Sequence, residues 1–313
     1  MSRVTTPPAS QAIRPAVMLH SRPARVIASR VLVIALGVFA IGAPPAQAQS
    51  NPPPGWVNPF PAFRIIGPLY GVGMEDLSVF LITSDEGHIL INTGLDDSIP
   101  YIRNNIESLG FRLEDVKIIL TMQAHWDHTA AMAEIKELTG AEVWATPKDA
   151  RVLEDGGFSD AHFGGRETFK PVAVDRVIRQ DDVITLGDLV ITVHEHPGHT
   201  EGSSSYTFQV NEAGRTYNVG IVNMGTINDG KHLVVNPTYD NVAVDFATTY
   251  NRQKQLDVDV WVSAHNAQYN MHDKYTPGQA YDPETFVDPA GYIRAIERLE
   301  SAYLGVIADE LDQ

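Results

Sequence analysis

One short segment constrains the fold of this chain more than any other, because a strand that should be buried runs directly into a cluster of polar side chains. Residues Val116–Thr121 are mostly apolar and predict a strand, and Gln123, His125, Asp127 and His128 follow at once. A buried strand has no packing use for such residues. A strand-to-helix turn lets side chains converge that a regular strand would point to opposite faces. We therefore predict a metal site at the end of this strand.

The composition is that of a globular protein whose metal ligands must be nitrogen or oxygen atoms. The 313 residues include no cysteine, which excludes iron–sulfur clusters, thiolate zinc sites and cysteine nucleophiles. There are 39 acidic side chains against 23 basic ones, a formal net charge of −16. Because sequence-independent binding to nucleic acid needs clustered Lys and Arg, we expect no nucleic-acid partner.

The first 48 residues have the pattern of a secretory signal. They contain five arginines and no acidic residue, and they include the apolar run Val31–Ala43 and the small-residue sequence Ala46-Gln47-Ala48. A run of this length suits the core of a signal, whereas a membrane span needs about 20 apolar residues. We predict cleavage after Ala48, no stable membrane anchor, a periplasmic or secreted location, and one domain over residues 49–313. An uncleaved anchor is the alternative.

Strands and helices alternate in both halves of this domain. The Pro-rich stretch Asn51–Pro61 predicts an extended arm, because proline restricts the backbone and removes a hydrogen-bond donor. In the first half we predict strands at Leu77–Thr83, His88–Asn92 and Val116–Thr121, and helices at Ile99–Leu109 and His128–Thr139. In the second half we predict strands at Val183–Leu186, Leu189–His194, Ser204–Val210, Thr216–Val222 and Val258–Ala264, and helices at Val242–Leu256 and Pro289–Ala308. Each half supplies strands and then a helix, which predicts an α/β fold of two sheets packed between helices.

Two further strand ends carry histidine. His199 follows the predicted strand 189–194, and His265 follows the predicted strand 258–264. In open α/β sheets, sites form beyond the carboxyl ends of the strands. We therefore expect His199 and His265 to lie near the polar cluster that follows the first strand.

Two neighbouring histidines compete with His199 for this role. His194 and His196 lie two residues apart and precede it closely. We interpret them as surface residues or as supports for the ligands, because the turn at Gly198 frees His199 to approach a metal.

Together these residues resemble the metallo-β-lactamase superfamily, and more closely its subclass 3 β-lactamases. The motifs that carry the resemblance are Gln123-x-His125-x-Asp127-His128, Gly198-His199-Thr200 and His265. It extends over nearly the whole chain after the signal, including Trp56, Pro59–Phe63, Tyr70–Gly73, Leu77–Thr83, Ser108–Asp115 and Phe286–Pro289. The resemblance implies a four-layer αββα sandwich. The lack of cysteine agrees with subclass 3, because subclasses 1 and 2 use a cysteine zinc ligand.

The resemblance implies two zinc positions. The first metal position would be formed by Gln123, His125 and His199, and the second metal position by Asp127, His128 and His265. Gln123 stands where most relatives have His, and an amide oxygen is a poorer zinc ligand than imidazole. We therefore expect one tightly bound zinc and a second, weaker one. Asn92 replaces an Asp that supports the ligands in the family, which should loosen the site further.

The implied function is a zinc-dependent hydrolase that opens the β-lactam ring. Zinc lowers the pKa of its bound water towards about 7, so that a metal-bound hydroxide can attack the amide carbonyl. Asp127 would be the catalytic residue that orients this nucleophile and helps to move its proton. The Ser-containing segment that holds the substrate carboxylate in subclass 3 aligns with residues 219–223, which lack serine, so Asn223 is the candidate substrate contact. We expect a monomer.

Two other functions stay open. One is a different hydrolase of the superfamily, such as a lactonase, a glyoxalase II-like thioesterase or a phosphodiesterase. Those relatives generally add an Asp that bridges the metals after the strand corresponding to Thr216–Val222, and here the nearest downstream acid is Asp229. The other is a non-catalytic periplasmic zinc-binding protein, which would account for Gln123, Asn92 and the missing serine. We favour the β-lactamase.

Overall fold

The computed structural model describes residues 51–312, and the fold given below is that of this part of the chain. The signal predicted for residues 1–48 lies outside the described residues. None of the helices within 51–312 combines the length and the apolar character that a membrane span requires.

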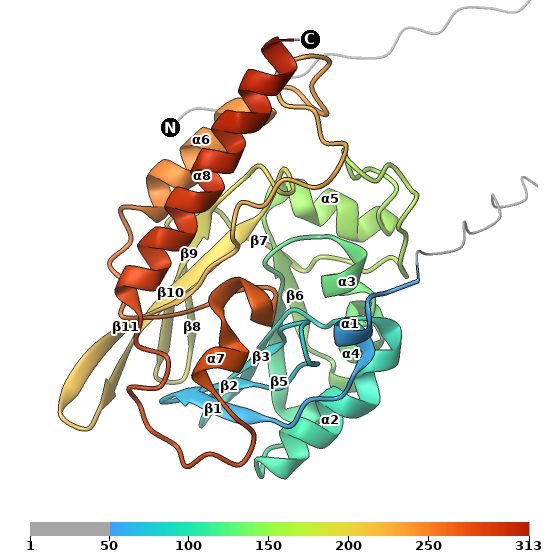
Figure 1. Ribbon diagram of the computed structural model, residues 1–313. Coiled ribbons are helices and arrows are strands. Elements are labelled where there is room, and N and C mark those ends of the chain that lie inside the picture. Colours follow the sequence, from blue (N-terminus) through green and yellow to red (C-terminus); the bar gives the residue numbers. More distant parts are fainter. Residues whose placement is uncertain (1–50, 313) are drawn as a thin grey trace, which may run out of the picture. The chain divides into compact units, whose positions relative to one another are not determined.

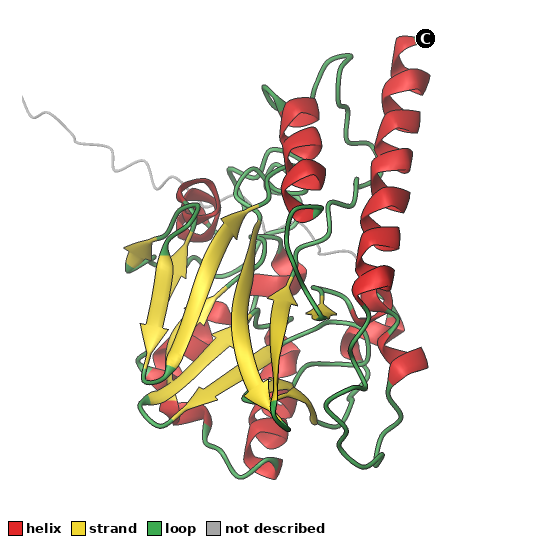
Figure 2. Cartoon of the chain, turned by 90° about the vertical axis from the view of Figure 1, so that its left-hand side faces the viewer, coloured by secondary structure: helices red, strands yellow, loops and turns green. Residues whose placement is uncertain are grey.

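Two mixed sheets form the centre of the fold (Figures 1 and 2). The strands of the first sheet follow the order β1-β2-β3-β4-β5-β6-β7, with bounds Phe63–Ile66, Leu69–Gly71, Phe80–Ser84, Gly87–Ile91, Val116–Leu120, Glu142–Ala145 and Arg176–Val177. Those of the second sheet follow the order β12-β11-β10-β9-β8, with bounds Val260–Val262, Arg215–Ile221, Ser204–Glu212, Leu189–Glu195 and Val183–Leu186. Strands β4, β5, β6 and β7 are parallel, and so are β11 and β12.

Helices cover the two outer faces of this pair of sheets (Figure 2). Their bounds are α1 Pro54–Val57, α2 Ile99–Ser108, α3 Trp126–Thr129, α4 Met132–Thr139, α5 Pro147–Asp155, α6 Val242–Gln253, α7 Met271–Lys274 and α8 Pro289–Leu311. Helices α6 and α8 lie side by side (Figure 1). Short 3-10 turns occur at Asp96–Ser98, Leu113–Asp115 and Asn266–Tyr269.

The alternation of side chains along each strand divides the core into two clusters. In β5, Ile118 and Leu120 face the second sheet, whereas Ile119 faces the helices α2, α4 and α5. Residues of α6 and α8 such as Phe246 and Tyr292 continue the core on the other side of the second sheet. The layers are therefore helix, sheet, sheet and helix, which confirms the predicted αββα sandwich.

Hydrogen bonds to backbone carbonyls join the two sheets at one edge. The amide of Ser204 in β10 donates to the carbonyl of Met122 (2.8 Å), and the hydroxyl of Tyr206 donates to the carbonyl of Thr121 (2.7 Å). On the other side of this edge, the amide of Ser78 donates to the carbonyl of Ala264 (3.0 Å). The segments that follow β5 and β12 are therefore held at the same edge of the sandwich.

Several predicted elements differ from the observed ones. The arm 51–61 is not extended throughout, because α1 forms within it. The helix predicted for 128–139 is two helices, α3 and α4, and Gly140 caps the second with a φ of 69°. Strands β1, β2, β6 and β7 and helix α5 were not predicted. Strand β8 has the predicted bounds.

Strand β5 offers a test of this packing. Ile119 is fully buried, so Ile119→Ala leaves a cavity beneath α2 and α4 and should lower the free energy of unfolding by about 2–5 kcal/mol. Val190 in β9 is 58% exposed, and Val190→Ala serves as the matched control with little change. Urea titrations of the metal-free proteins measure both values. Equal stabilities of the two variants would contradict the assigned packing.

Candidate metal centre

The polar residues after β5 lie in a tight turn that leads into α3. His125 is the residue before the helix and has an extended backbone, while Asp127 and His128 lie in the first turn. The carbonyl of His125 accepts from the amide of His128 (3.0 Å) and from the hydroxyl of Thr129 (2.8 Å). These bonds close the turn, so Asp127 and His128 are presented on a rigid backbone.

Asn92 positions the beginning of this turn. Its backbone is left-handed, with a φ of 63°, a conformation that Asn tolerates better than most residues. Its Oδ1 accepts from the amide of Met122 (3.0 Å), and its Nδ2 donates to the carbonyl of Ser78 (3.3 Å). An aspartate could accept the first bond but not donate the second. The neutral amide therefore supports the turn on both sides.

Three of the predicted ligands form a compact cluster. The ligand atoms of Asp127, His128 and His265 lie within 4.8 Å of one another. Asp127 Oδ2 is 3.1 Å from His128 Nε2 and 3.5 Å from His265 Nε2. A carboxylate oxygen and two imidazole nitrogens are a donor set that zinc prefers. The structure thus brings together the three residues of the second metal position.

The electrostatics of this cluster favour a charged carboxylate and a neutral imidazole. Burial opposes the ionisation of Asp127, but the imidazoles of His128 and His265 outweigh it and hold the pKa of Asp127 well below its usual range. Burial lowers the pKa of His128. His265 differs, because its hydrogen bond with Asp76 raises its pKa against the effect of burial. A neutral His128 and an ionised Asp127 are the protonation states that metal binding requires.

The residues of the first metal position are also buried. Gln123, His125 and His199 are 2%, 4% and 7% exposed, and the rings of His125 and His199 lie 4.8 Å apart between centroids. The Nδ1 atom of His199 is bound to the carbonyl of Thr226 (2.7 Å), so its Nε2 is left for a metal. Burial lowers the pKa of His199 well below its usual value, which keeps the ring neutral.

Buried polar atoms without partners test whether a metal fits. Among the described residues, no hydrogen-bond partner is present for Oε1 of Gln123 or for either ring nitrogen of His128. Such atoms are rare in proteins, and each needs an explanation. Oxygen and nitrogen atoms of this kind fit a zinc ion in both predicted positions. As ligands of zinc, the six residues stay a prediction.

The sequence did not indicate four residues that support the histidines. They are Asp76, Asp160, Thr226 and Lys231. Asp76 Oδ2 lies 3.1 Å from His265 Nδ1, and Asp160 Oδ2 lies 3.5 Å from His125 Nε2. The ammonium group of Lys231 donates to the carbonyl of His199 (2.7 Å), and burial lowers the pKa of this lysine to about 8. None of the four lies in a recognisable motif, so only their spatial neighbours identify them.

Asn223, the candidate substrate contact, lies in a buried polar cluster. It is 2% exposed, and its backbone amide donates to the hydroxyl of Ser205 (2.9 Å), which also contacts His196 Nδ1 (2.6 Å). Gln253 of α6 donates to the carbonyl of Asn223 (2.7 Å). His196 is 1% exposed, so of the two interpretations given for it the surface residue is wrong, and the support for the ligands stays a prediction. His194 is half-buried and contacts Thr207.

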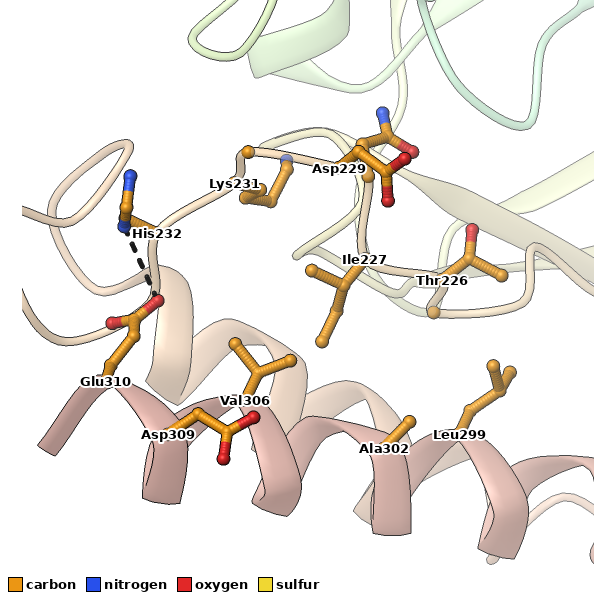
Figure 3. Close-up of a pocket in the computed structure, with 13 residues that line it drawn as sticks. Thr226, Ile227, Asp229, Lys231, His232, Leu299, Ala302, Val306, Asp309 and Glu310 are labelled. Carbon is orange, nitrogen blue, oxygen red and sulfur yellow. Dashed lines mark ion pairs between the residues drawn. The ribbon is translucent and has the colours of Figure 1, made fainter. Parts of the chain in front are cut away.

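A cavity of about 530 Å³ lies between the loop 225–232 and α8 (Figure 3). Its apolar wall is formed by Ile227 and by Leu299, Ala302 and Val306 of α8. Thr226 and Lys231 line it as well, and both contact His199. The loop that holds His199 therefore has a cavity behind it.

The last turn of α8 anchors the far end of this loop. The carboxylate of Glu310 accepts hydrogen bonds from the amides of Leu233, Val234 and Val235, at 2.7–2.9 Å. Glu310 also lies 3.8 Å from the ring of His232 (Figure 3). These bonds satisfy backbone groups of the loop that would otherwise lack partners.

The fold is also found in solved structures of metallo-β-lactamases. The chain is similar to the metallo-β-lactamase GOB-18 from Elizabethkingia meningoseptica, with 40% identity, a TM-score of 0.82, and coverage of 85% of this chain and 99% of that one. It is similar to the class B3 di-zinc metallo-β-lactamase LRA-12 from an Alaskan soil metagenome, with 43% identity, a TM-score of 0.80, and coverage of 83% and 98%.

Sequence comparison gives a second set of relatives. The model of the metallo-β-lactamase superfamily matches residues 73–212. A hydroxyacylglutathione hydrolase from Bradyrhizobium sp. strain BTAi1 is 32% identical over 147 residues, which cover 44% of this chain and 49% of the relative. One from Methylobacterium nodulans is 28% identical over 144 residues, with 44% and 48% covered. The chain thus spans about half the length of these relatives.

The fold, the residue cluster and the relatives together define the class of this protein. The αββα sandwich with a histidine and aspartate cluster at its sheet edge is that of a metallohydrolase, and the chain belongs to the metallo-β-lactamase superfamily. Within that superfamily, its structure is similar to those of the class B3 members.

The unequal ligands predict unequal zinc affinities. Dialysis against rising concentrations of a chelator should remove the zinc of the first metal position well before that of the second, because Gln123 contributes only an amide oxygen. Metal analysis of each dialysed sample gives the zinc content per chain. In the variant Gln123→His, the chelator concentrations that remove the two zinc ions should lie closer together. Simultaneous loss of two zinc ions from the unaltered protein would contradict the prediction.

Proposed function

We propose that this protein is a zinc-dependent β-lactamase that hydrolyses the cyclic amide of its substrate. The observation that carries the proposal is the cluster of Asp127, His128 and His265, of which the first two are buried, at the edge of a sandwich similar to those of class B3 enzymes. We further propose that the signal predicted for residues 1–48 directs this activity to the periplasm or the exterior.

Zinc in these positions would supply Lewis-acid chemistry, polarising a carbonyl and making water acidic enough to react near neutral pH. Asp127 contacts both imidazoles through Oδ2, which leaves Oδ1 to orient the attacking water and accept its hydrogen bond. Since the pKa of Asp127 is held low, this carboxylate stays ionised throughout the physiological range. The imidazoles of His128 and His265 keep it in place, and Asp76 keeps His265 in place.

Recognition of the substrate requires groups around this cluster. Ring opening leaves a carboxylate and an amine, and the substrate already carries one carboxylate. Asn223 stays the candidate contact for that carboxylate. Its Nδ2 is buried without a hydrogen-bond partner, so the side chain has to rotate before Nδ2 can donate to the substrate. Its neighbours Ser205 and Gln253 set how far it can move.

A second function is favoured by the sequence relatives. Hydroxyacylglutathione hydrolases match 44% of the chain, which makes a thioesterase the alternative. The bridging Asp expected for that class has no counterpart near the end of β11, because Asn223 is neutral and Asp229 lines the cavity beside α8. We therefore favour the β-lactamase.

A panel of substrates on one preparation separates the two functions. Zinc-loaded protein is assayed with a penicillin, a carbapenem, a lactone and a thioester, and the same assays are repeated after removal of zinc with a chelator. We expect turnover of β-lactams that is lost with zinc and returns when zinc is restored. Turnover of the thioester alone would support the alternative, and no turnover of any substrate would refute both.

Asp127→Ala removes the carboxylate that orients the nucleophile. The variant should stay folded and lose hydrolysis by at least about 100-fold, because general acid–base and orienting groups contribute factors of this size. Circular dichroism checks the fold, and initial rates with saturating zinc measure the activity. Asp188 is exposed and lies in the turn before β9, at the opposite end of that strand from His199, so Asp188→Ala is the control. Undiminished activity of Asp127→Ala would refute the assigned role.

A further inference from the structure

Three predicted ligand histidines each have a polar neighbour at one ring nitrogen, which leaves the other nitrogen for a metal. In His199 the carbonyl of Thr226 binds Nδ1, and in His265 the carboxylate of Asp76 lies 3.1 Å from Nδ1. In His125 the two ring nitrogens exchange places, because here Nε2 rather than Nδ1 faces a polar neighbour. That neighbour is the carboxylate of Asp160, whose Oδ2 lies 3.5 Å away, an ion-pair distance at which no hydrogen bond forms. The nitrogen of His125 left for the metal is therefore Nδ1.

The carboxylate of Asp160 is fixed in this orientation. Asp160 follows α5 in the chain and is 7% exposed. Its Oδ1 accepts from the backbone amides of His162 (2.9 Å) and Phe163, so only Oδ2 is turned towards His125. The ring of Phe163 packs edge-on against the ring of His125, with centroids 4.8 Å apart. The imidazole of His125 thus lies between the carboxylate of Asp160 and the ring of Phe163.

An anion in this place changes what His125 offers to a metal. A carboxylate behind a ligating histidine fixes its tautomer and raises the basicity of the other nitrogen. His125 and His199 are the two imidazoles of the first metal position, where Gln123 supplies only an amide oxygen. Each metal position has one carboxylate next to a ligand histidine. Asp160 lies next to His125 of the first position, and Asp76 lies next to His265 of the second.

We propose that Asp160 is a positioning residue for the first metal position, where its carboxylate holds His125 with Nδ1 towards the metal and compensates for the weak ligand Gln123. This inference rests on the proposed function only in so far as it assumes that the six predicted ligands bind zinc. It assigns to each metal position its own supporting carboxylate.

Two matched substitutions test the assignment. Asp160→Asn keeps an oxygen that can accept from the amides of His162 and Phe163, but it removes the negative charge. It should weaken zinc binding at the first metal position about 10- to 100-fold and leave the tight zinc unchanged. Asp76→Asn should do the opposite. Competition titrations with a chromophoric chelator resolve the two affinities, and Asp188→Asn, in the exposed turn before β9, is the control.

Cobalt substitution and rescue distinguish positioning from a loss of structure. The visible spectrum of the cobalt protein should lose the contribution of the first metal position in Asp160→Asn and keep that of the second. Adding Gln123→His to Asp160→Asn should restore the first position, because a third imidazole replaces the lost support. Equal weakening of both positions, an unchanged weak site, or failure of this rescue would each overturn the assignment.

The result is separable from the proposed function. A chain that binds zinc in both positions but hydrolyses no β-lactam would refute the β-lactamase proposal, and the titrations of Asp160→Asn would still decide the role of Asp160. A chain that takes up no zinc would overturn both.

Discussion

The burial of the Asp127 carboxylate is the constraint on which the rest of the site depends. An ionised carboxylate in a protein interior is strongly unfavourable unless cationic or hydrogen-bonding groups surround it. Here it is 6% exposed, and its close ionisable neighbours are two imidazoles, His128 and His265. One comes from the same helical turn and the other from the far end of the chain. A divalent cation between them would relieve the cost of burying this charge.

The architecture meets this constraint by joining two sheets at one edge. The carbonyls of Thr121 and Met122 are bound by side-chain and backbone groups of β10, so the turn after β5 cannot shift relative to the second sheet. Segment 76–78 pairs with residues near His265 in the same way. Because backbone bonds set these positions, the site depends little on the conformations of long side chains. The ligand geometry is a property of the sandwich as a whole.

The sequence predicted the parts of this molecule that have a local signature. The alternating strands of the second half and the dense cluster from Gln123 to His128 are of this kind, and so is the layered fold. Helix α5 was missed because charged residues interrupt its apolar face, and β6 because only one of its four residues is β-branched, against three of four in β8. Asp76 and Asp160 were missed for a different reason. Each acts on a histidine brought near by tertiary folding, and no periodicity reports such a pair.

The loop 225–232, which contacts His199, depends on Glu310 in a distant part of the chain. The carboxylate of Glu310 accepts hydrogen bonds from the amides of residues 233–235, which directly follow that loop, and Glu310 comes after all six predicted ligands in the order of synthesis. A growing polypeptide therefore lacks this anchor until translation has passed α8. Small zinc modules acquire their metal locally and fold around it. In this protein, by contrast, the loop that contacts His199 is fully anchored only once the last turn of α8 has folded.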